Sequence, residues 1–135
     1  MSITYALEGD LLRVVGSGRL PAAEVHEGLR GALAQVHLPP NLRVLWDFRS
    51  VPTLDLSSDQ LRALRSIAAE AELPELRARF AWVASADVVF GIGCMFRALA
   101  AVLPLEVEVF RGLAQASEWL AGEPPLVPNG NGRPK

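Results

Sequence analysis

The sequence has few of the residues that several protein classes require. A single cysteine, Cys94, excludes an intramolecular disulfide framework. Lysine occurs only at Lys135, and the remaining basic residues are scattered arginines balanced by 15 acids, so no phosphate-binding stripe is predicted and nucleic acid is not an expected partner. The apolar stretch from 88 to 105 contains Arg97 and Pro104, which favours a buried or peripheral helix over a transmembrane one.

The N-terminus, MSITYALEGD, lacks the basic and apolar regions of a signal peptide, so a cytoplasmic location is expected. The 135 residues are 50% hydrophobic and 21% charged, with a formal net charge of −2. These values are typical of one globular domain and exclude intrinsic disorder. We predict a domain over residues 1–121, followed at 122–135 by a Pro/Gly-rich C-terminal tail that some contact could hold in place.

The first half of the chain predicts a hairpin, a helix and a strand. Residues 3–7 and 11–15 are β-prone runs joined by Glu8-Gly9-Asp10, which predicts a β-hairpin. A helix is expected from Pro21, since Val25, Leu29, Leu33 and Val36 follow at helical spacing until Pro39-Pro40. An apolar strand is expected over 42–48.

The second half alternates helices and strands. Helices are expected from Ser57 to the Leu73-Pro74 pair, over 87–103 and over 112–121, and strands over 79–84 and 105–110. The resulting order is ββαβαβαβα. This alternation predicts an α/β sandwich in which four helices pack on a mixed, mostly parallel sheet with an antiparallel first strand.

Several segments, taken in this order and spacing, carry a family resemblance. They are LWDF-RSV at 45–51, LDLS at 54–57, FAWVA at 80–84, VEVF at 107–110, and Ala116 with Trp119-Leu120. Together they resemble the SpoIIAA-like branch of the STAS superfamily, which includes sulfate transporters and anti-sigma-factor antagonists. The resemblance implies a single-domain STAS-like sandwich. It also implies similarity to CRAL-TRIO lipid carriers, and with it an apolar ligand or a membrane contact.

The resemblance also implies a candidate phosphosite. Anti-sigma-factor antagonists carry a phosphorylated serine at the start of a helix, two residues after an aspartate, and here Asp55-Leu56-Ser57-Ser58 aligns with that motif. Leu56 and Ser58 depart from it, because they replace a serine and a glycine. Ser57 and Gln60 are also spaced as a capping box, which is the competing and favoured interpretation of Ser57.

No arrangement for catalysis or metal binding is found, and no cofactor is expected. Gly16-Ser17-Gly18 is not a nucleophile elbow, and His26 and His37 lie too far apart along one helix to share a metal. Gly91-Ile92-Gly93 is interpreted as a close helix contact rather than a phosphate loop. Three aspartates near predicted strand ends could form an acidic pocket, although turn and cap roles are favoured: Asp47, Asp55 and Asp87.

The helix over 87–103 is apolar on nearly all sides. We expect its sheet-facing stripe to consist of Val88, Ile92, Met95, Phe96, Leu99, Val102 and Leu103. A second face then holds Val89, Phe90, Gly93 and Ala100, with Arg97 among them. We predict that Val89, Phe90, Gly93 and Arg97 form an interface or apolar-ligand patch, unless the last helix and the tail cover it.

These observations favour a non-enzymatic binding or signalling module that acts through protein–protein interaction. The alternative is a carrier of an apolar small molecule or lipid, with peripheral membrane contact through the helix over 87–103. A regulatory protein, a lipid or a second copy in a homodimer are the partners that such a module could have.

Overall fold

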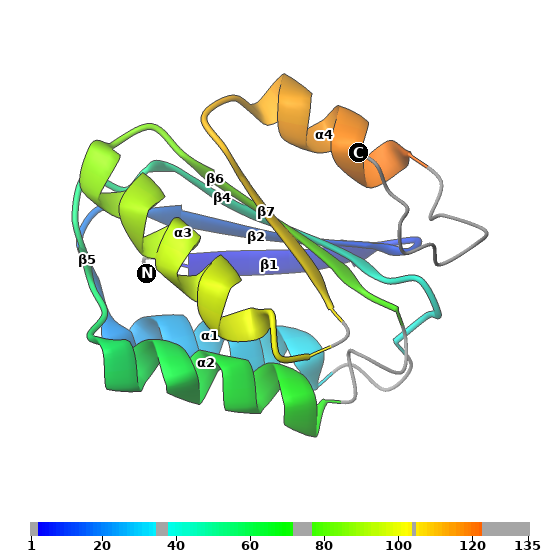
Figure 1. Ribbon diagram of the computed structural model, residues 1–135. Coiled ribbons are helices and arrows are strands. Elements are labelled where there is room, and N and C mark those ends of the chain that lie inside the picture. The colour runs from blue at the N-terminus through cyan, green and yellow to red at the C-terminus, as the bar shows by residue number, and fades with distance from the viewer. Residues whose placement is uncertain (1–2, 35–37, 72–76, 104, 123–135) are drawn as a thin grey trace.

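The computed structural model describes residues 3–34, 38–71, 77–103 and 105–122. These residues form a five-stranded sheet and four helices, joined in the predicted order ββαβαβαβα, with two additional strands of two residues each (Figure 1). The predicted α/β class and mostly parallel sheet are therefore confirmed. The tail at 123–135 lies outside the described residues, so its separation from the domain stays a prediction.

The predicted N-terminal hairpin is present. Strand β1 (Ile3–Glu8) pairs antiparallel with β2 (Leu11–Ser17), and the register runs from Ile3 opposite Gly16 to Glu8 opposite Leu11. Gly9 in the connecting turn has a φ of 64°, a left-handed conformation that glycine adopts without steric cost. The hairpin gives the sheet its antiparallel edge.

The remaining strands of the sheet are parallel and follow chain order. They are β4 (Arg43–Ser50), β6 (Arg79–Ala84) and β7 (Glu106–Phe110), and the sheet order is β1-β2-β4-β6-β7. Each matches a predicted apolar run to within two residues at either end. Because every parallel crossover steps in the same direction and such crossovers are right-handed, their helices lie on one face of the sheet.

Those helices are α1 (Ala22–Leu33), α2 (Ser58–Glu70) and α3 (Asp87–Ala100), whereas α4 (Leu113–Ala121) follows β7 and packs on the opposite face (Figure 1). We call these the three-helix face and the α4 face. Helix α1 ends at Leu33; Val36 and His37 lie outside the described residues, as do Leu73 and Pro74.

Helix α3 is three residues shorter than predicted. It ends at Ala100, and the backbone then turns so that the Leu103 N–H donates to the Ala100 carbonyl at 2.9 Å. The cause is local, because a residue that precedes proline is sterically disfavoured in the helical conformation and Leu103 precedes Pro104.

The larger core lies under the three-helix face, and its centre is aromatic. Trp46 stacks on Trp82 with ring centroids 5.6 Å apart, and Phe48 meets Trp82 edge-on at 5.1 Å. Phe80 and Phe96 extend this cluster toward α3. The α4 face has a smaller cluster: Leu45, Ala81, Val83, Ala116 and Leu120.

Candidate functional site

The first turns of α1 and α2 are held together by a ladder that sequence analysis did not predict. Strand β3 (Leu20–Pro21) pairs in parallel with β5 (Leu54–Asp55). Leu20 precedes a proline, which keeps it extended, and the side chains of Leu20 and Leu54 are buried in the core. The ladder therefore places Asp55 beside Pro21, immediately before α1 begins.

Ser57 begins α2 as its N-cap, in the predicted capping box. The Gln60 backbone N–H donates to Ser57 Oγ at 3.2 Å, and Gln60 Oε1 accepts from the Ser57 N–H at 2.8 Å. Two helix-end donors are thereby satisfied, which stabilises α2 by about 1 kcal/mol. Ser57 remains exposed, so its hydroxyl is accessible from solvent.

His26 of α1 contacts the same turn of α2. Its Nε2 lies 2.9 Å from the Gln60 carbonyl oxygen, to which it donates in the tautomer that protonates this nitrogen. His26, which was interpreted as a surface histidine, therefore also has a structural role, because its imidazole links α1 to α2. In the parts of the chain that are described, no group of three His, Cys, Asp or Glu residues could hold a metal ion.

An open depression of about 440 Å³ lies between these first turns. Its walls combine apolar residues with polar ones: Ala22, Leu54, Leu56, Asp55, Ser57 and Gln60. Ala22, Leu54 and Leu56 are buried, whereas Asp55, Ser57 and Gln60 are exposed, so the accessible lining is mainly polar and only a small apolar area lies beneath it. We call this feature the Ser57 depression. Ser58 is exposed on α2 but is not among its lining residues.

The three aspartates do not form one acidic pocket. Asp47 points to the α4 face, where its carboxylate accepts from Arg49 Nε at 2.8 Å and Nη2 at 2.9 Å. These hydrogen bonds lower the pKa of Asp47, although its burial opposes them. Asp87 instead pairs with Arg111 at 2.8 Å. The alternating directions of strand side chains separate Asp47 from the Ser57 depression.

The predicted faces of α3 are partly wrong. Of the predicted sheet-facing stripe, Phe96 is buried and Ile92, Leu99 and Leu103 pack against the core, but Val88, Met95 and Val102 are exposed. The other buried residues of the helix belong to the predicted second face: Val89, Gly93 and Ala100. A Cβ placed on Gly93 would lie 2.5 Å from the Trp82 ring, so only glycine allows α3 to approach this indole. The interpretation of 91–93 as a close helix contact is therefore confirmed at Gly93.

The four residues of the predicted interface patch therefore do not form one exposed surface. Val89 and Gly93 are buried, so neither can line one. Phe90 is half-buried beneath the guanidinium of Arg111, which lies 4.1 Å from the ring centroid. Arg97 is exposed but pairs with Glu108 of β7 at 3.1 Å. The exposed large apolar side chains on this helix are Val88 and Met95.

A helix that crosses a bilayer needs about 20 predominantly apolar residues. Among the described helices, none is both long enough and apolar enough for a membrane span. The apolar stretch from 88 to 105 is divided between α3, the turn after it and the approach to β7.

Sequence reasoning missed part of the Ser57 depression. The segment at 54–57 and Gln60 were identified from the sequence, but Ala22 of the neighbouring helix was not. The Leu20-Pro21 dipeptide was the available signal, because it predicts extended backbone directly before α1. The pairing of Leu20-Pro21 with Leu54-Asp55 is too short to give a periodic pattern in the sequence.

Comparison with known proteins supports the fold. No family model matches the chain, and no curated protein matches it. Among solved structures, it is similar to an uncharacterised protein of the DUF3478 family, with a SpoIIAA-like fold, from Shewanella loihica PV-4. The TM-score is 0.55 at 20% sequence identity, and the match covers 89% of this chain and 93% of the other. The chain thus has a SpoIIAA-like fold.

Proposed function

We propose that this protein is a non-enzymatic, cytoplasmic binding or signalling module that acts through protein–protein interaction at the Ser57 depression. One observation carries the proposal: exposed polar residues surround a small apolar area at the first turns of two helices. Interfaces between proteins commonly combine an apolar centre with a polar rim. The resemblance of Asp55-Leu56-Ser57-Ser58 to the phosphosite motif of anti-sigma-factor antagonists supports the same interpretation.

Ser57 is the residue through which a partner would regulate this contact. A kinase would transfer a phosphoryl group from ATP to Ser57 Oγ, releasing ADP and the hydroxyl proton. The phosphate would gain from the N-terminal end of α2, where backbone N–H groups and the helix dipole favour negative charge. It would also add charge to a rim that already holds Asp55. Phosphorylation would thus preserve the helix while changing which partner surface fits.

The test compares a charge at Ser57 with a charge elsewhere on α2. Immobilised wild-type protein, Ser57→Asp and Ser57→Ala are exposed to extract from the source organism, and the retained proteins are identified by mass spectrometry. Ser66→Asp is the control, because Ser66 is exposed on the same helix outside the depression. We expect Ser57→Asp alone to change the retained set. Identical sets for wild type and Ser57→Asp would contradict regulation at Ser57.

A second candidate function is the carriage of an apolar small molecule or lipid with peripheral membrane contact through α3. The observation that favours it is the exposure of Val88 and Met95 on this helix and of Val102 just beyond it. The same surface could instead join two copies in a homodimer. Native mass spectrometry of freshly purified protein distinguishes these candidates, because a bound lipid favours the carrier, a doubled mass favours the dimer, and a ligand-free monomer weakens both.

A further inference from the structure

A groove runs between the edge strand β1 and helix α1, on the other side of the first turn of α1 from the Ser57 depression. Its volume is about 260 Å³, and its lining residues come from both elements: Ile3, Tyr5, Ala23, Glu24, Glu27 and Gly28. We call this feature the β1–α1 groove. It contains neither Ser57 nor any other residue of the Ser57 depression, so a ligand bound there would be independent of the proposed function.

Glycines in α1 set the shape of the groove. A Cβ on Gly28 would lie 2.9 Å from Ile3 Cγ2, and one on Gly31 would lie 2.8 Å from the Tyr5 hydroxyl oxygen. The helix therefore approaches β1 closely at these two positions, and the Ile3 and Tyr5 side chains lie directly against its backbone. Together with Ala23, they give the groove apolar walls.

The edge of β1 is open to a further strand. Within the described residues β1 pairs only with β2, so its outer backbone groups have no strand partner. Its sequence, ITYALE, contains no lysine, arginine or proline, the residues that commonly protect sheet edges from pairing. At the other edge, β7 carries Glu106 and Glu108, both held in ion pairs with arginines. An added strand therefore finds access at β1.

The charge of the groove indicates what that strand should carry. Glu24 and Glu27 both line it, and Glu24 Oε1 is buried without a hydrogen-bond partner in the part of the chain that is described. Glu24 is the third residue of α1. In a capping box, a glutamate at this position accepts a hydrogen bond from the backbone N–H of the N-cap residue. Here the N-cap is Pro21, which has no N–H. Among the described residues, Glu24 Oε1 therefore has no donor, and a basic side chain of a ligand could supply one.

We propose that the β1–α1 groove binds an extended peptide of a partner protein, which adds to β1 as a further strand. Alternate side chains of the peptide face α1. In this register an apolar side chain lies against Ile3 and Ala23, and a lysine or arginine donates to Glu24 and Glu27. A second copy of this chain fits less well, because its own β1 would offer Glu8 and no basic residue.

The test uses short synthetic peptides and fluorescence anisotropy. The probes are labelled heptapeptides Thr-X-Thr-Lys-Thr-X-Thr, with X as valine, leucine or phenylalanine, and their counterparts with glutamate in place of lysine. We expect the lysine series to bind full-length protein and the glutamate series to bind at least about tenfold more weakly. Glu24→Gln/Glu27→Gln should weaken the lysine series about tenfold. Glu70→Gln, which changes an exposed carboxylate at the end of α2, should not.

Hydrogen exchange locates the bound peptide. We expect bound lysine peptide to slow exchange of amides within β1, because an added strand forms backbone hydrogen bonds there. Protection confined to other elements overturns the proposal. It is also overturned if the lysine series binds no tighter than the glutamate series, or if the lysine series does not bind at millimolar concentration. A dimer in sedimentation velocity whose β1 amides are protected without peptide also overturns it, and assigns this edge to a second copy.

Discussion

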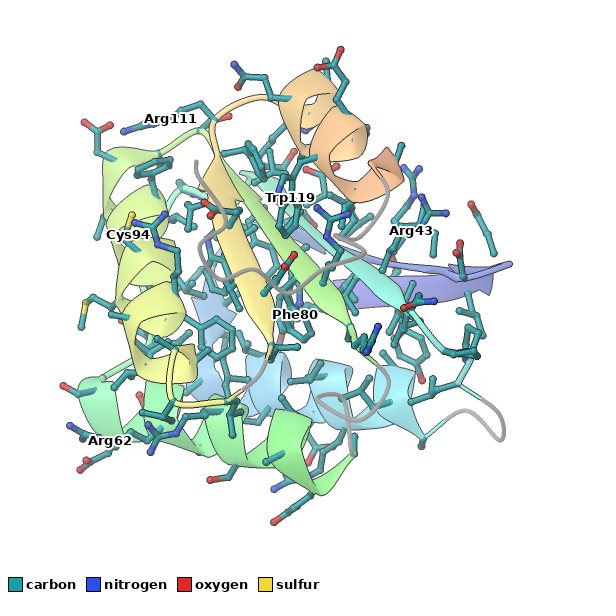
Figure 2. All side chains as sticks on the ribbon, turned by 45° about the vertical axis from the view of Figure 1, so that its right-hand side comes forward. Arg43, Arg62, Phe80, Cys94, Arg111 and Trp119 are labelled. Atoms are coloured by element: carbon teal, nitrogen blue, oxygen red, sulfur yellow. The ribbon has the colours of Figure 1, made fainter. Side chains whose placement is uncertain are left out.

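The two faces of the sheet are stabilised by different means. The three-helix face buries an aromatic cluster around Trp82 and Trp46 beneath α1, α2 and α3. The α4 face has one short helix over a few aliphatic residues, and arginines supplement it (Figure 2). Arg43 Nη1 donates to the Leu120 carbonyl at 3.4 Å, and Arg79 Nη1 donates to that of Gly122 at 2.7 Å. Arg79 also lies over the Trp119 ring, 4.2 Å from its centroid.

One sheet can therefore combine two kinds of stabilisation. Burial of aromatic and aliphatic surface dominates where three helices exclude water. On the other face, guanidinium groups satisfy the free carbonyls at the C-terminal end of α4, where positive charge is also favoured by the helix dipole. Each such contact contributes less than a buried aromatic ring, and salt weakens it. Substitutions that affect one face and spare the other test this distinction.

The greatest loss of stability is expected at the centre of the three-helix face. Trp82→Ala removes a ring that stacks on Trp46 and contacts Phe96, together with the hydrogen bond from its Nε1 to the Val89 carbonyl. We expect it to lower the free energy of unfolding by about 3–5 kcal/mol, measured by urea denaturation. Trp82→Phe, which keeps an aromatic ring, should cost less. A similar loss in both variants would contradict this expectation, because it would show that an aromatic ring alone does not stabilise the core and that the indole itself is required.

The same substitution on each face compares them directly. Leu29 of α1 and Leu120 of α4 are both buried, the first in the larger core and the second in the smaller cluster. We expect Leu29→Ala to cost about 3–5 kcal/mol and Leu120→Ala about 2 kcal/mol, because a cavity near the margin of the smaller cluster collapses more readily. Urea denaturation of both variants measures the difference. Equal losses would contradict the distinction between the faces.

The ion pair on the α4 face predicts a pH dependence. Hydrogen bonds from Arg49 hold the pKa of Asp47 below its usual range, so folding favours the ionised carboxylate. Its stabilisation is present above the ordinary aspartate pKa and is lost as the pH falls through the lowered one. We expect Asp47→Asn to cost about 1–2 kcal/mol at pH 7, and the difference from wild type to narrow below about pH 4.

Chemical denaturation over a pH series measures this effect. Arg49→Gln is the matched variant, because it removes the partner and leaves Asp47 in place. Its deficit relative to wild type should narrow over the same acid range. A deficit for Asp47→Asn that stays constant from pH 7 to pH 3 would show that the ion pair is not its source.

The mildest change is expected at the exposed start of α2. Ser57→Ala removes the acceptor for the Gln60 N–H and should cost about 0.5–2 kcal/mol. Ser57→Asp should remain close to wild type, because aspartate also caps a helix and its charge is favourable there. Ser66→Ala on the same helix should not destabilise the protein. Thermal unfolding followed by circular dichroism measures all three; equal midpoints for Ser57→Ala and Ser66→Ala would exclude a cap contribution.

Much of the fold could be predicted from the sequence because its strands are compact apolar runs between clear breaks. The run RFAWVA coincides with β6, and Glu8-Gly9-Asp10 correctly indicated the hairpin. The capping box at Ser57 was equally visible, since it depends on two side chains three residues apart. Such features are local, so sequence spacing alone determines them.

The orientation of α3 could not be predicted in the same way. Its two candidate stripes are both apolar or small, so helical periodicity favours neither strongly. The choice depends on a distant residue, because the Trp82 indole requires Gly93 where the helix crosses the sheet. The Ser57 depression and the β1–α1 groove likewise depend on pairings between separate segments. Neither the β3–β5 ladder nor the approach of α1 to β1 leaves a repeating pattern in the sequence.

The sheet order β1-β2-β4-β6-β7 has a consequence for synthesis on the ribosome. Each strand pairs with the sheet strand that precedes it in the chain. No later strand has to insert between two earlier ones. The hairpin can form first, and each emerging helix and strand can then join the existing edge. Growth ends at β7, and α4 then covers the opposite face, so the N-terminal hairpin is the template for the whole sheet.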